Sequence, residues 1–153
     1  MRKSKINISG FKIGTAENRE GLTGVTVILA PDGGATAGVD VRGCAPGTRE
    51  TDLLDPRKTV QKIHAVVLSG GSAFGLEAAS GCVKYLAEQG VGFPIGNVCV
   101  PIVCSAVLFD LMIGDEKAYP DLLMGYEAAK SASSEFLSGC NGAGTGATVD
   151  KLL

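Results

Sequence analysis

One segment of the sequence has the residue types of an anion-binding turn. Gly70, Gly71 and Ser72 lie between an apolar run and a segment with helical spacing. Backbone N–H groups at a helix start lack partners within the helix and lie at the positive end of its dipole. Such a turn can hold a phosphate, a carboxylate or a developing oxyanion. The GxxxxGK[ST] and GxSxG patterns are not met, and a tight strand-to-helix turn without a ligand stays an alternative.

A second candidate is the glycine-rich segment 139–148, which reads Gly-Cys-Asn-Gly-Ala-Gly-Thr-Gly-Ala-Thr. Its glycines allow the backbone to approach a ligand or another segment closely. Asn141 carries an amide that can donate a hydrogen bond to an oxyanion. The dinucleotide-binding pattern is not met, because no clear strand precedes the segment and no acidic residue follows at the expected spacing. A flexible loop is the alternative.

A third group has the residue types of a cysteine–histidine catalytic set, namely Cys140, Cys104, His64 and Asp110. A catalytic cysteine needs a base within hydrogen-bond reach. His64, the only histidine, opens an apolar run, so a structural histidine is the preferred interpretation. One histidine without a CxxC pair does not make a zinc site of the usual spacing, so we predict no metal and no cofactor.

Composition excludes several classes of protein. The chain has 153 residues, 22 of them glycine, a net charge of −2, and 45% hydrophobic residues. It is too apolar and too weakly charged for a disordered chain, and it lacks the basic character of a nucleic-acid-binding protein. No apolar run reaches the roughly 18 residues of a membrane span, and no apolar signal core follows the N-terminus. The five widely spread cysteines predict free thiols in a reducing cytoplasm.

Strand signals come first along the chain. A run rich in β-branched residues, 25–30, is followed by a Pro-Asp-Gly-Gly turn and by the alternating segment 35–41, which together predict a β-hairpin. The run 64–69 predicts a strand buried on both faces. The apolar run 98–108 is broken by Pro101, and 92–96 is predicted to be a loop.

Two helices are predicted between and after these strands. Apolar residues spaced at three or four predict a helix over 73–89. A second helix is expected over 121–137, with Asp121 as its N-cap. Residues 148–153 are expected to be the first turns of another helix that does not finish a domain edge. The mixture of strands and helices favours a layered α/β or α+β fold.

Six stretches, in order, resemble the L-aminopeptidase/D-esterase family, which includes β-peptidyl aminopeptidases and nylon-oligomer hydrolases. The matching residues are 37–43, 45–54, 64–76, 100–103, 106–111 and 142–149. The resemblance implies a layered α-β-β-α sandwich of the aminopeptidase and ornithine acetyltransferase type, incomplete in this chain. It also implies a precursor that cleaves itself, so that a Ser or Thr at the new N-terminus of the downstream piece becomes the nucleophile.

On this resemblance, residues 1–153 are a single domain and the upstream portion of such a hydrolase. The expected partners are a downstream segment carrying the nucleophile, a small amide or peptide substrate, and further copies of the chain, without nucleic acid or membrane. The alternative is a truncated, non-catalytic module that binds a small ligand or serves assembly.

The resemblance also implies site residues. The family pattern Gly-Asn-x-Gly-Ala-Gly-Thr-Gly places Cys140 where the asparagine stands and Asn141 one place later, so both are predicted as catalytic residues. Lys117 is included because some relatives use a lysine there. The predicted substrate and oxyanion region consists of Gly70, Gly71, Ser72, Gly142, Gly144 and Lys117.

Overall fold

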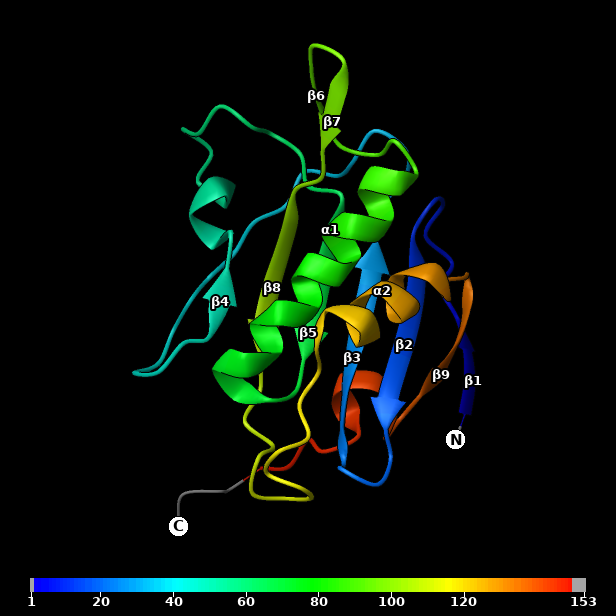
Figure 1. Cartoon of the computed structure of the whole chain (residues 1–153). Helices are drawn as coiled ribbons and strands as arrows, with labels where there is room; N and C mark the ends of the chain where they lie inside the picture. Colours follow the sequence, from blue (N-terminus) through cyan, green and yellow to red (C-terminus); the bar gives the residue numbers. More distant parts are fainter. Residues whose placement is uncertain (1, 150–153) are drawn as a thin grey trace.

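A five-stranded mixed sheet lies at the centre of the computed structural model, which describes residues 2–149 (Figure 1). The strand order is β2-β3-β5-β8-β4, and only β5 and β8 are parallel neighbours. Both therefore end at the edge of the sheet where the antiparallel strand β3 begins. The strands are β2 (Lys12–Asn18), β3 (Thr23–Leu29), β4 (Thr48–Arg49), β5 (Ala65–Ser69) and β8 (Val103–Val107).

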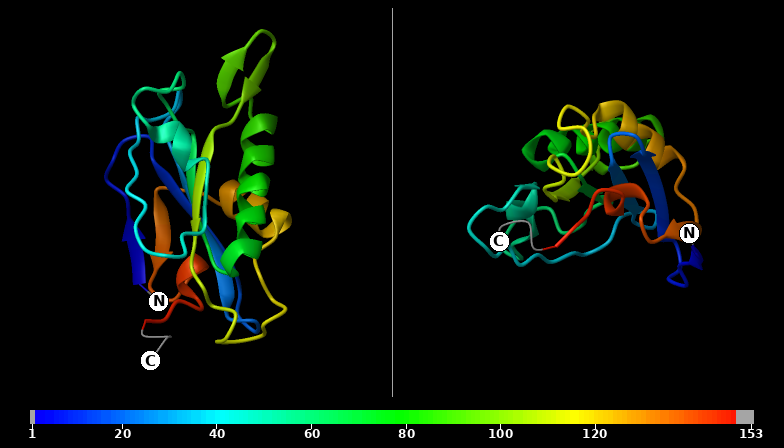
Figure 2. Two further views of the ribbon diagram at one scale, coloured as in Figure 1. Left: turned by 90° about the vertical axis from the view of Figure 1, so that its left-hand side faces the viewer. Right: turned by 90° about the horizontal axis from the view of Figure 1, so that it is seen from below.

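Helices cover one face of this sheet, and a two-stranded sheet lies on the other side (Figure 2). The helices are α1 (Ala78–Glu88) and α2 (Leu122–Lys130). The smaller sheets pair β1 (Arg2–Lys5) with β9 (Glu135–Ser138), and β6 (Phe93–Ile95) with β7 (Val98–Val100). Three 3-10 turns complete the elements: η1 (Thr51–Leu54), η2 (Ser72–Glu77) and η3 (Gly142–Gly144).

The core lies between the central sheet and the two helices. Valines with no exposed surface, Val25, Val27 and Val67, face small residues on the helices. The helices themselves pack closely, because a Cβ at Gly81 or Gly125 would overlap the backbone of the other helix. β-branched residues on the strands and small residues on the helices thus explain the helix layer.

The opposite face of the sheet is only partly covered. Thr15, Thr26, Leu68 and Ala106 form a row across four strands on this face, and Leu68 is 39% exposed. The strand predicted to be buried on both faces is therefore buried on one. The β1–β9 pair covers part of the row. Helices, a central sheet and the beginning of a further β layer agree with the predicted α-β-β-α order.

The predicted hairpin of 25–30 and 35–41 is wrong. β3 is bonded on both of its edges, to β2 and to β5, so neither edge is available for the returning segment. Beyond the turn only Ala35 pairs, in an isolated bridge to Ile63. The segment 36–47 then runs as an irregular loop whose apolar side chains are largely exposed. The alternation of small and apolar residues in 35–41 was misleading, because these apolar side chains do not pack against an apolar surface of the fold.

The helix predictions are confirmed at their starts. Asp121 caps α2 by accepting a hydrogen bond from the Met124 N–H at 2.8 Å. The predicted range 121–137 is too long, because α2 ends at Lys130 and β9 takes up its last residues. The helix predicted over 73–89 is found as η2 followed by α1.

Two further expectations concern the ends of apolar segments. The predicted loop 92–96 contains strand β6, which forms a hairpin with β7, whereas the break at Pro101 does separate β7 from β8. Of the helix expected over 148–153, residues 148–149 are not helical and the rest lies outside the described residues. No helix within 2–149 combines the length and the apolar character that crossing a bilayer demands.

Candidate functional site

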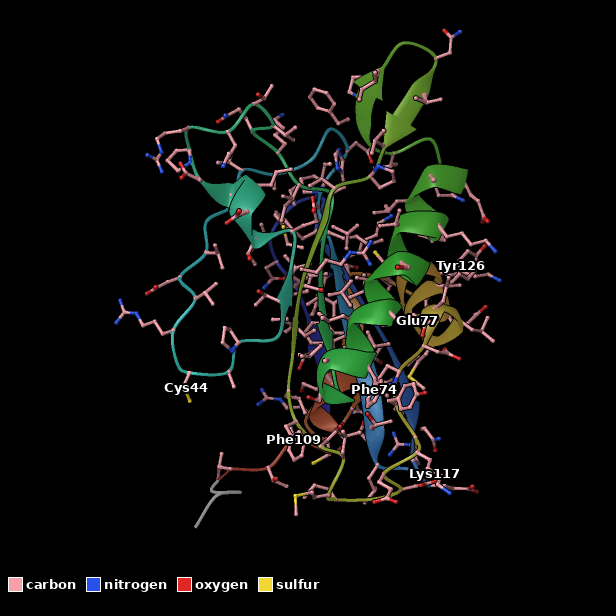
Figure 3. All side chains as sticks on the ribbon, turned by 60° about the vertical axis from the view of Figure 1, so that its left-hand side comes forward. Cys44, Phe74, Glu77, Phe109, Lys117 and Tyr126 are labelled. Atoms are coloured by element: carbon pink, nitrogen blue, oxygen red, sulfur yellow. The ribbon has the colours of Figure 1, made fainter. Side chains whose placement is uncertain are left out.

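The predicted site residues gather at the edge of the sheet where β5 and β8 end. Gly70–Ser72 follow β5, Asp110 follows β8, and η3 packs against β3. Segments that follow parallel strands meet at one edge of a sheet, which is where α/β proteins commonly place their ligands. Figure 3 shows Lys117 and Phe109 at this same end of the molecule.

The turn after β5 binds an anion, and that anion belongs to the chain itself. The Gly71 N–H donates to Oδ1 of Asp110 at 2.6 Å. The N–H groups on either side are also used, Gly70 donating to the Gly24 carbonyl and Ser72 to the Leu108 carbonyl. Each amide has one hydrogen, so in this conformation the three N–H groups are not available to a substrate oxyanion.

The turn also contains backbone strain. Gly71 has φ +80°, which glycine adopts without cost, but Ser72 follows with φ +52°. A non-glycine residue in the left-handed region costs of order 1–3 kcal/mol and persists only where its surroundings hold it. The hydrogen bond from the Ser72 N–H supplies part of that hold.

Asp110 joins the segments of this edge. The residue is 2% exposed, and its carboxylate accepts a second hydrogen bond, from Oγ1 of Thr23 at 2.7 Å. Gly70 and Gly146 pack so closely that a Cβ on either would overlap the Asp110 side chain. One buried carboxylate thus links the start of β3, the end of β5 and the segment after η3.

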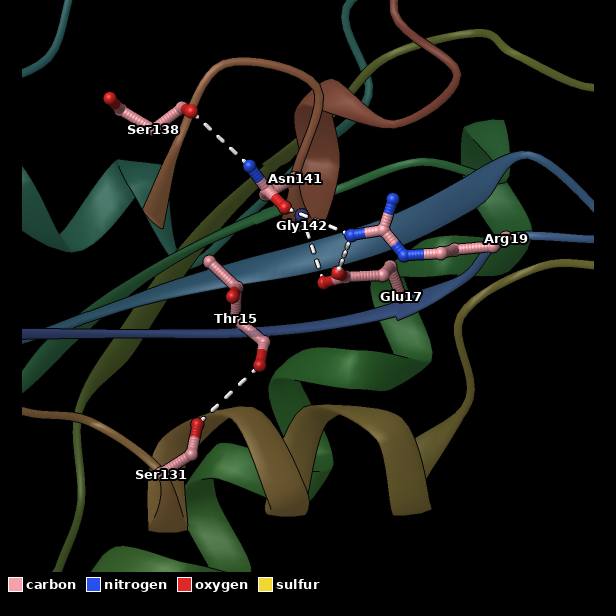
Figure 4. A network of polar contacts seen from close by, with 7 residues as sticks. All are labelled: Thr15, Glu17, Arg19, Ser131, Ser138, Asn141 and Gly142. Carbon is pink, nitrogen blue, oxygen red and sulfur yellow. Dashed lines mark hydrogen bonds and ion pairs between the residues drawn. The ribbon is translucent and has the colours of Figure 1, made fainter. Parts of the chain in front are cut away.

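Asn141 is the predicted site residue whose side chain is most clearly held (Figure 4). It is 5% exposed, its Oδ1 accepts from Arg19 Nη2 at 3.0 Å, and its Nδ2 donates to the Ser138 carbonyl at 3.2 Å. Because arginine can only donate, this contact fixes which end of the amide faces Arg19. Glu17 completes the network, accepting from Arg19 at 2.6 Å and from the Gly142 N–H at 3.3 Å.

Asn141 lies at a groove of about 470 Å³ on the partly covered face of the sheet. The groove floor is apolar, with Ile13, Ile28 and Leu68 from three strands, and Phe136 of β9 forms part of a wall. A groove of this size, mostly apolar with a few convergent polar groups, is typical of small-molecule sites. Its polar end can bind a carbonyl oxygen while the floor contacts an apolar substituent.

Two of the predicted residues line this groove, Asn141 and Gly144. Cys140 is exposed in the turn before Asn141. Lys117 is an exposed residue of the loop after β8, and its backbone N–H donates to the Asp115 carboxylate at 2.9 Å. Gly142 lies buried beside the groove and bonds Glu17 instead.

The hydrogen bonds of the cysteine–histidine set do not join its members to one another. His64 precedes β5 and accepts a hydrogen bond on Nδ1 from the Ile102 N–H at 3.0 Å, whereas Asp110 lies beyond the other end of that strand. Five strand residues separate them, which is roughly 17 Å at the usual rise of a strand. Cys104 Sγ donates to the Glu50 carbonyl at 3.4 Å, and Cys140 is exposed in the segment between β9 and η3. The preferred interpretation of His64 as structural agrees with these contacts.

The buried His64 makes stability depend on pH. Burial lowers the pKa of His64 below its usual 6.5. As the pH falls, the unfolded chain therefore binds a proton before the folded chain does, so stability present above about pH 6.5 is lost below it. We expect the urea midpoint to fall between pH 7.5 and 5.5, and to fall less for His64→Gln. Equal pH dependence of the two proteins would contradict this role.

The thiols are expected to divide into two reactivity classes. Cys44, Cys99 and Cys140 are exposed, whereas burial raises the pKa of the Cys82 thiol to about 12 and also raises that of Cys104. Only the thiolate reacts. Ellman's reagent should therefore titrate the three exposed thiols in the native chain and the other two only after urea is added. Equal reaction of all five before unfolding would be the opposite result.

Sequence reasoning missed Arg19 and Glu17, and it considered Asp110 only in the cysteine–histidine set. A signal for the first two exists, because Glu-Asn-Arg-Glu at 17–20 places charges at a strand end just before the glycine of a turn. β2 was not predicted, so these charges could not be placed at the same edge as Asn141.

Sequence comparison relates the chain to known proteins. A sequence model described as peptidase family S58 matches residues 5–152. An uncharacterized aminopeptidase of Mycobacterium tuberculosis is 46% identical over 129 residues, covering 84% of this chain and 37% of that protein. A 6-aminohexanoate-oligomer endohydrolase of Agromyces sp. is 36% identical over 149 residues, covering 97% of this chain and 39% of that protein.

Solved structures give the same architecture. A β-aminopeptidase of Burkholderia sp. superposes with a TM-score of 0.67 at 19% identity, over 91% of this chain and 41% of that one. Ornithine acetyltransferase of Mycobacterium tuberculosis, complexed with ornithine, superposes with a TM-score of 0.52 at 15% identity, over 99% and 85%. The fold is therefore of the aminopeptidase and ornithine acetyltransferase type. The chain spans between 37% and 45% of the length of the curated relatives it matches.

Proposed function

Because the chain belongs to peptidase family S58, we propose that it is the upstream portion of an N-terminal-nucleophile amide hydrolase. The observation that carries the proposal is the extent of the match. It runs through residues 5–152 here but takes in only 37% to 45% of the relatives. In this proposal the remaining part supplies a Ser or Thr that self-cleavage exposes as a new N-terminus.

The proposed reaction is hydrolysis of a small amide or peptide. Two relatives are named an aminopeptidase and a 6-aminohexanoate-oligomer endohydrolase, and both names describe hydrolysis. The nucleophile's hydroxyl attacks the substrate carbonyl and its proton passes to the nucleophile's own α-amino group. The carbonyl oxygen then bears the charge that donors of the upstream portion must stabilise.

Asn141 is the donor that the geometry favours for this charge. Its Nδ2 carries two hydrogens, and one is used by the Ser138 carbonyl. Arg19 holds the other end of the amide, so the second hydrogen has a defined direction at the groove that Gly144 also lines. The apolar floor of the groove is proposed to receive the substrate's substituent.

The other predicted site residues are proposed to have structural roles or roles that stay predictions. Gly70, Gly71 and Ser72 stabilise the edge through their bonds to Asp110 and to two backbone carbonyls. Gly142 connects the Asn141 segment to Glu17. Direct roles for Cys140 and Lys117 stay predictions, since both side chains are solvent-exposed.

We further propose that residues 1–153 form one domain, that copies of the chain assemble, and that the protein is cytoplasmic. The single core between the sheet and its two helices supports the first statement. The partly covered sheet face and the free strand edges support the second. The five free cysteines support the third, because disulfides are rare in a reducing compartment.

The alternative is a non-catalytic module that binds a small ligand. One observation favours it, which is that the groove and the Asn141 network are formed entirely by this chain. Calorimetry with L-leucinamide separates the two candidates when it is combined with an activity assay, because a binding module takes up the amide without cleaving it.

The experiment compares two polypeptides, the chain itself and the chain joined after Val149 to the corresponding downstream segment of the Mycobacterium tuberculosis relative. The joined protein is expected to hydrolyse L-amino-acid p-nitroanilides, and the chain alone is not. Circular dichroism confirms that each is folded, and co-production of the two parts as separate chains replaces a fusion that does not fold. Hydrolysis by the chain alone, or a folded inactive assembly, would contradict the proposal.

A further inference from the structure

The β6–β7 hairpin projects from the body of the molecule (Figures 1 and 2). Apolar side chains on one of its faces are exposed. Phe93 pairs with Val100 and Ile95 with Val98, so these four side chains share one face. Ile95 and Val98 are 56% and 59% exposed. No charged residue occurs between Gln89 and Asp110, so the hairpin lacks the charges that usually protect an exposed strand edge.

The two edges of the hairpin differ. A two-residue loop, in which Gly96 has φ +58°, makes Ile95 and Val98 a hydrogen-bonded pair. The next pair, Pro94 and Cys99, is then a non-hydrogen-bonded pair, so the N–H and C=O of Cys99 point away from β6. The matching position on the other edge is Pro94, which has no N–H. β7 is therefore the edge on which another strand can form a reciprocal pair of hydrogen bonds.

The sequence of β7 is its own complement. Val98-Cys99-Val100 reads the same in both directions, so two such strands laid antiparallel place Val98 opposite Val100 of the second copy and Cys99 opposite itself. β-branched residues facing one another stabilise a sheet. A two-stranded hairpin alone is at best marginally stable in water. A sheet of three or more strands with an apolar face is more stable, so pairing with a second hairpin would stabilise this one.

We propose that β7 is a self-association edge, and that two copies of this chain pair β7 with β7 about a two-fold axis beside Cys99. The pairing joins two hairpins into a four-stranded sheet and is isologous, as in most dimers. The β7 edge is uncharged and self-complementary, and these two properties favour a second copy of the chain over a charged partner. The inference names one surface for the proposed assembly of copies and does not depend on the proposed hydrolysis.

The first test changes only the edge. Cys99→Pro removes the outward N–H while leaving the bonds between β6 and β7, and Cys99→Val keeps the N–H and removes the thiol. The molar mass of the full chain is measured by light scattering over a wide range of concentration. The unchanged chain and Cys99→Val are expected to reach twice 15.6 kDa at the same concentration, and Cys99→Pro to need at least about tenfold more protein.

The second test uses cross-linking. A hydrogen-bonded antiparallel pair places its Cα atoms about 5.5 Å apart, within the range that a disulfide spans. Chains with Cys99 as their only exposed thiol (Cys44→Ser, Cys140→Ser) are compared with chains that keep Cys44 instead (Cys99→Ser, Cys140→Ser). With diamide as oxidant, the covalent dimer should form at least about tenfold faster through Cys99, because random collision serves both thiols alike.

Three results would overturn the inference. A mass of 15.6 kDa at every concentration would contradict both the β7 pairing and the proposed assembly of copies. A dimer that Cys99→Pro leaves unchanged removes this surface while the assembly stands. Equal cross-linking through Cys99 and Cys44 removes the two-fold pairing at Cys99. None of these results bears on hydrolysis, which the joined protein tests separately.

Discussion

Replacing Asp110 with alanine is expected to lower the free energy of unfolding by about 2–6 kcal/mol, because each of the two buried groups left without a partner costs about 1–3 kcal/mol. The Thr23 hydroxyl and the Gly71 N–H both lose their acceptor. Stabilities of single domains lie at about 5–15 kcal/mol, so this one change removes a large share. Urea unfolding followed by circular dichroism measures the effect.

Two variants separate the buried hydrogen bonds from the removal of a charge. Asp110→Asn keeps an oxygen for the Gly71 N–H and offers an NH₂ to the Thr23 oxygen, so it should retain most of the stability that alanine loses. Asp32→Ala removes an exposed carboxylate in a turn and should stay within about 0.5 kcal/mol of the unchanged chain. If Asp110→Ala behaves like Asp32→Ala, then Asp110 does not hold this edge together.

Replacing Asn141 with alanine in the joined, active protein is expected to lower kcat by about 10²–10³-fold, the usual loss when one oxyanion donor is removed. The change in KM should be smaller, because the groove's apolar floor lies on other residues. Steady-state hydrolysis of an L-amino-acid p-nitroanilide measures both constants.

Asn141→Asp distinguishes donation from positioning. The aspartate keeps an acceptor for Arg19 but has no hydrogen to give to an oxyanion, so it should lose as much kcat as alanine does while remaining folded. Asn7→Ala changes an exposed loop residue that does not line the groove, so it is the matched control and should keep full activity. An Asn141→Asp protein with unchanged kcat would remove Asn141 from the proposed oxyanion site.

Local chemistry predicted some elements of this fold well and others poorly. The Asp121 cap and the β-branched run of β3 act within a few residues, so their pattern is visible in the sequence. β2 could not be recognised in this way. Its sequence, Lys-Ile-Gly-Thr-Ala-Glu-Asn, has little β propensity, and the strand is held in place by its contacts with β3 and α2. The false hairpin at 35–41 has the same origin, since strand pairing depends on which edges other segments occupy.

The candidate site shows the same division. Asn141 could be selected from its residue type and its glycine-rich surroundings, but its partners Arg19 and Glu17 are more than a hundred residues away in the chain. A role for the Gly70–Ser72 turn in a substrate or oxyanion site stays a prediction, and in the structure the Gly71 N–H donates to an anion of the chain itself. That its anion is Asp110 depends on where the segment after β8 passes, which residue types alone do not determine.

The mass of the joined polypeptide after purification tests the central claim most directly. Self-cleavage is the step that makes an N-terminal nucleophile, and it adds one water across the peptide bond that breaks. The account therefore predicts two masses whose sum is the precursor mass plus that of one water, with Ser or Thr at the N-terminus of the downstream piece. Replacing that Ser or Thr with alanine should leave one mass and no hydrolysis. A folded, single-mass polypeptide that nevertheless hydrolyses p-nitroanilides would contradict the claim.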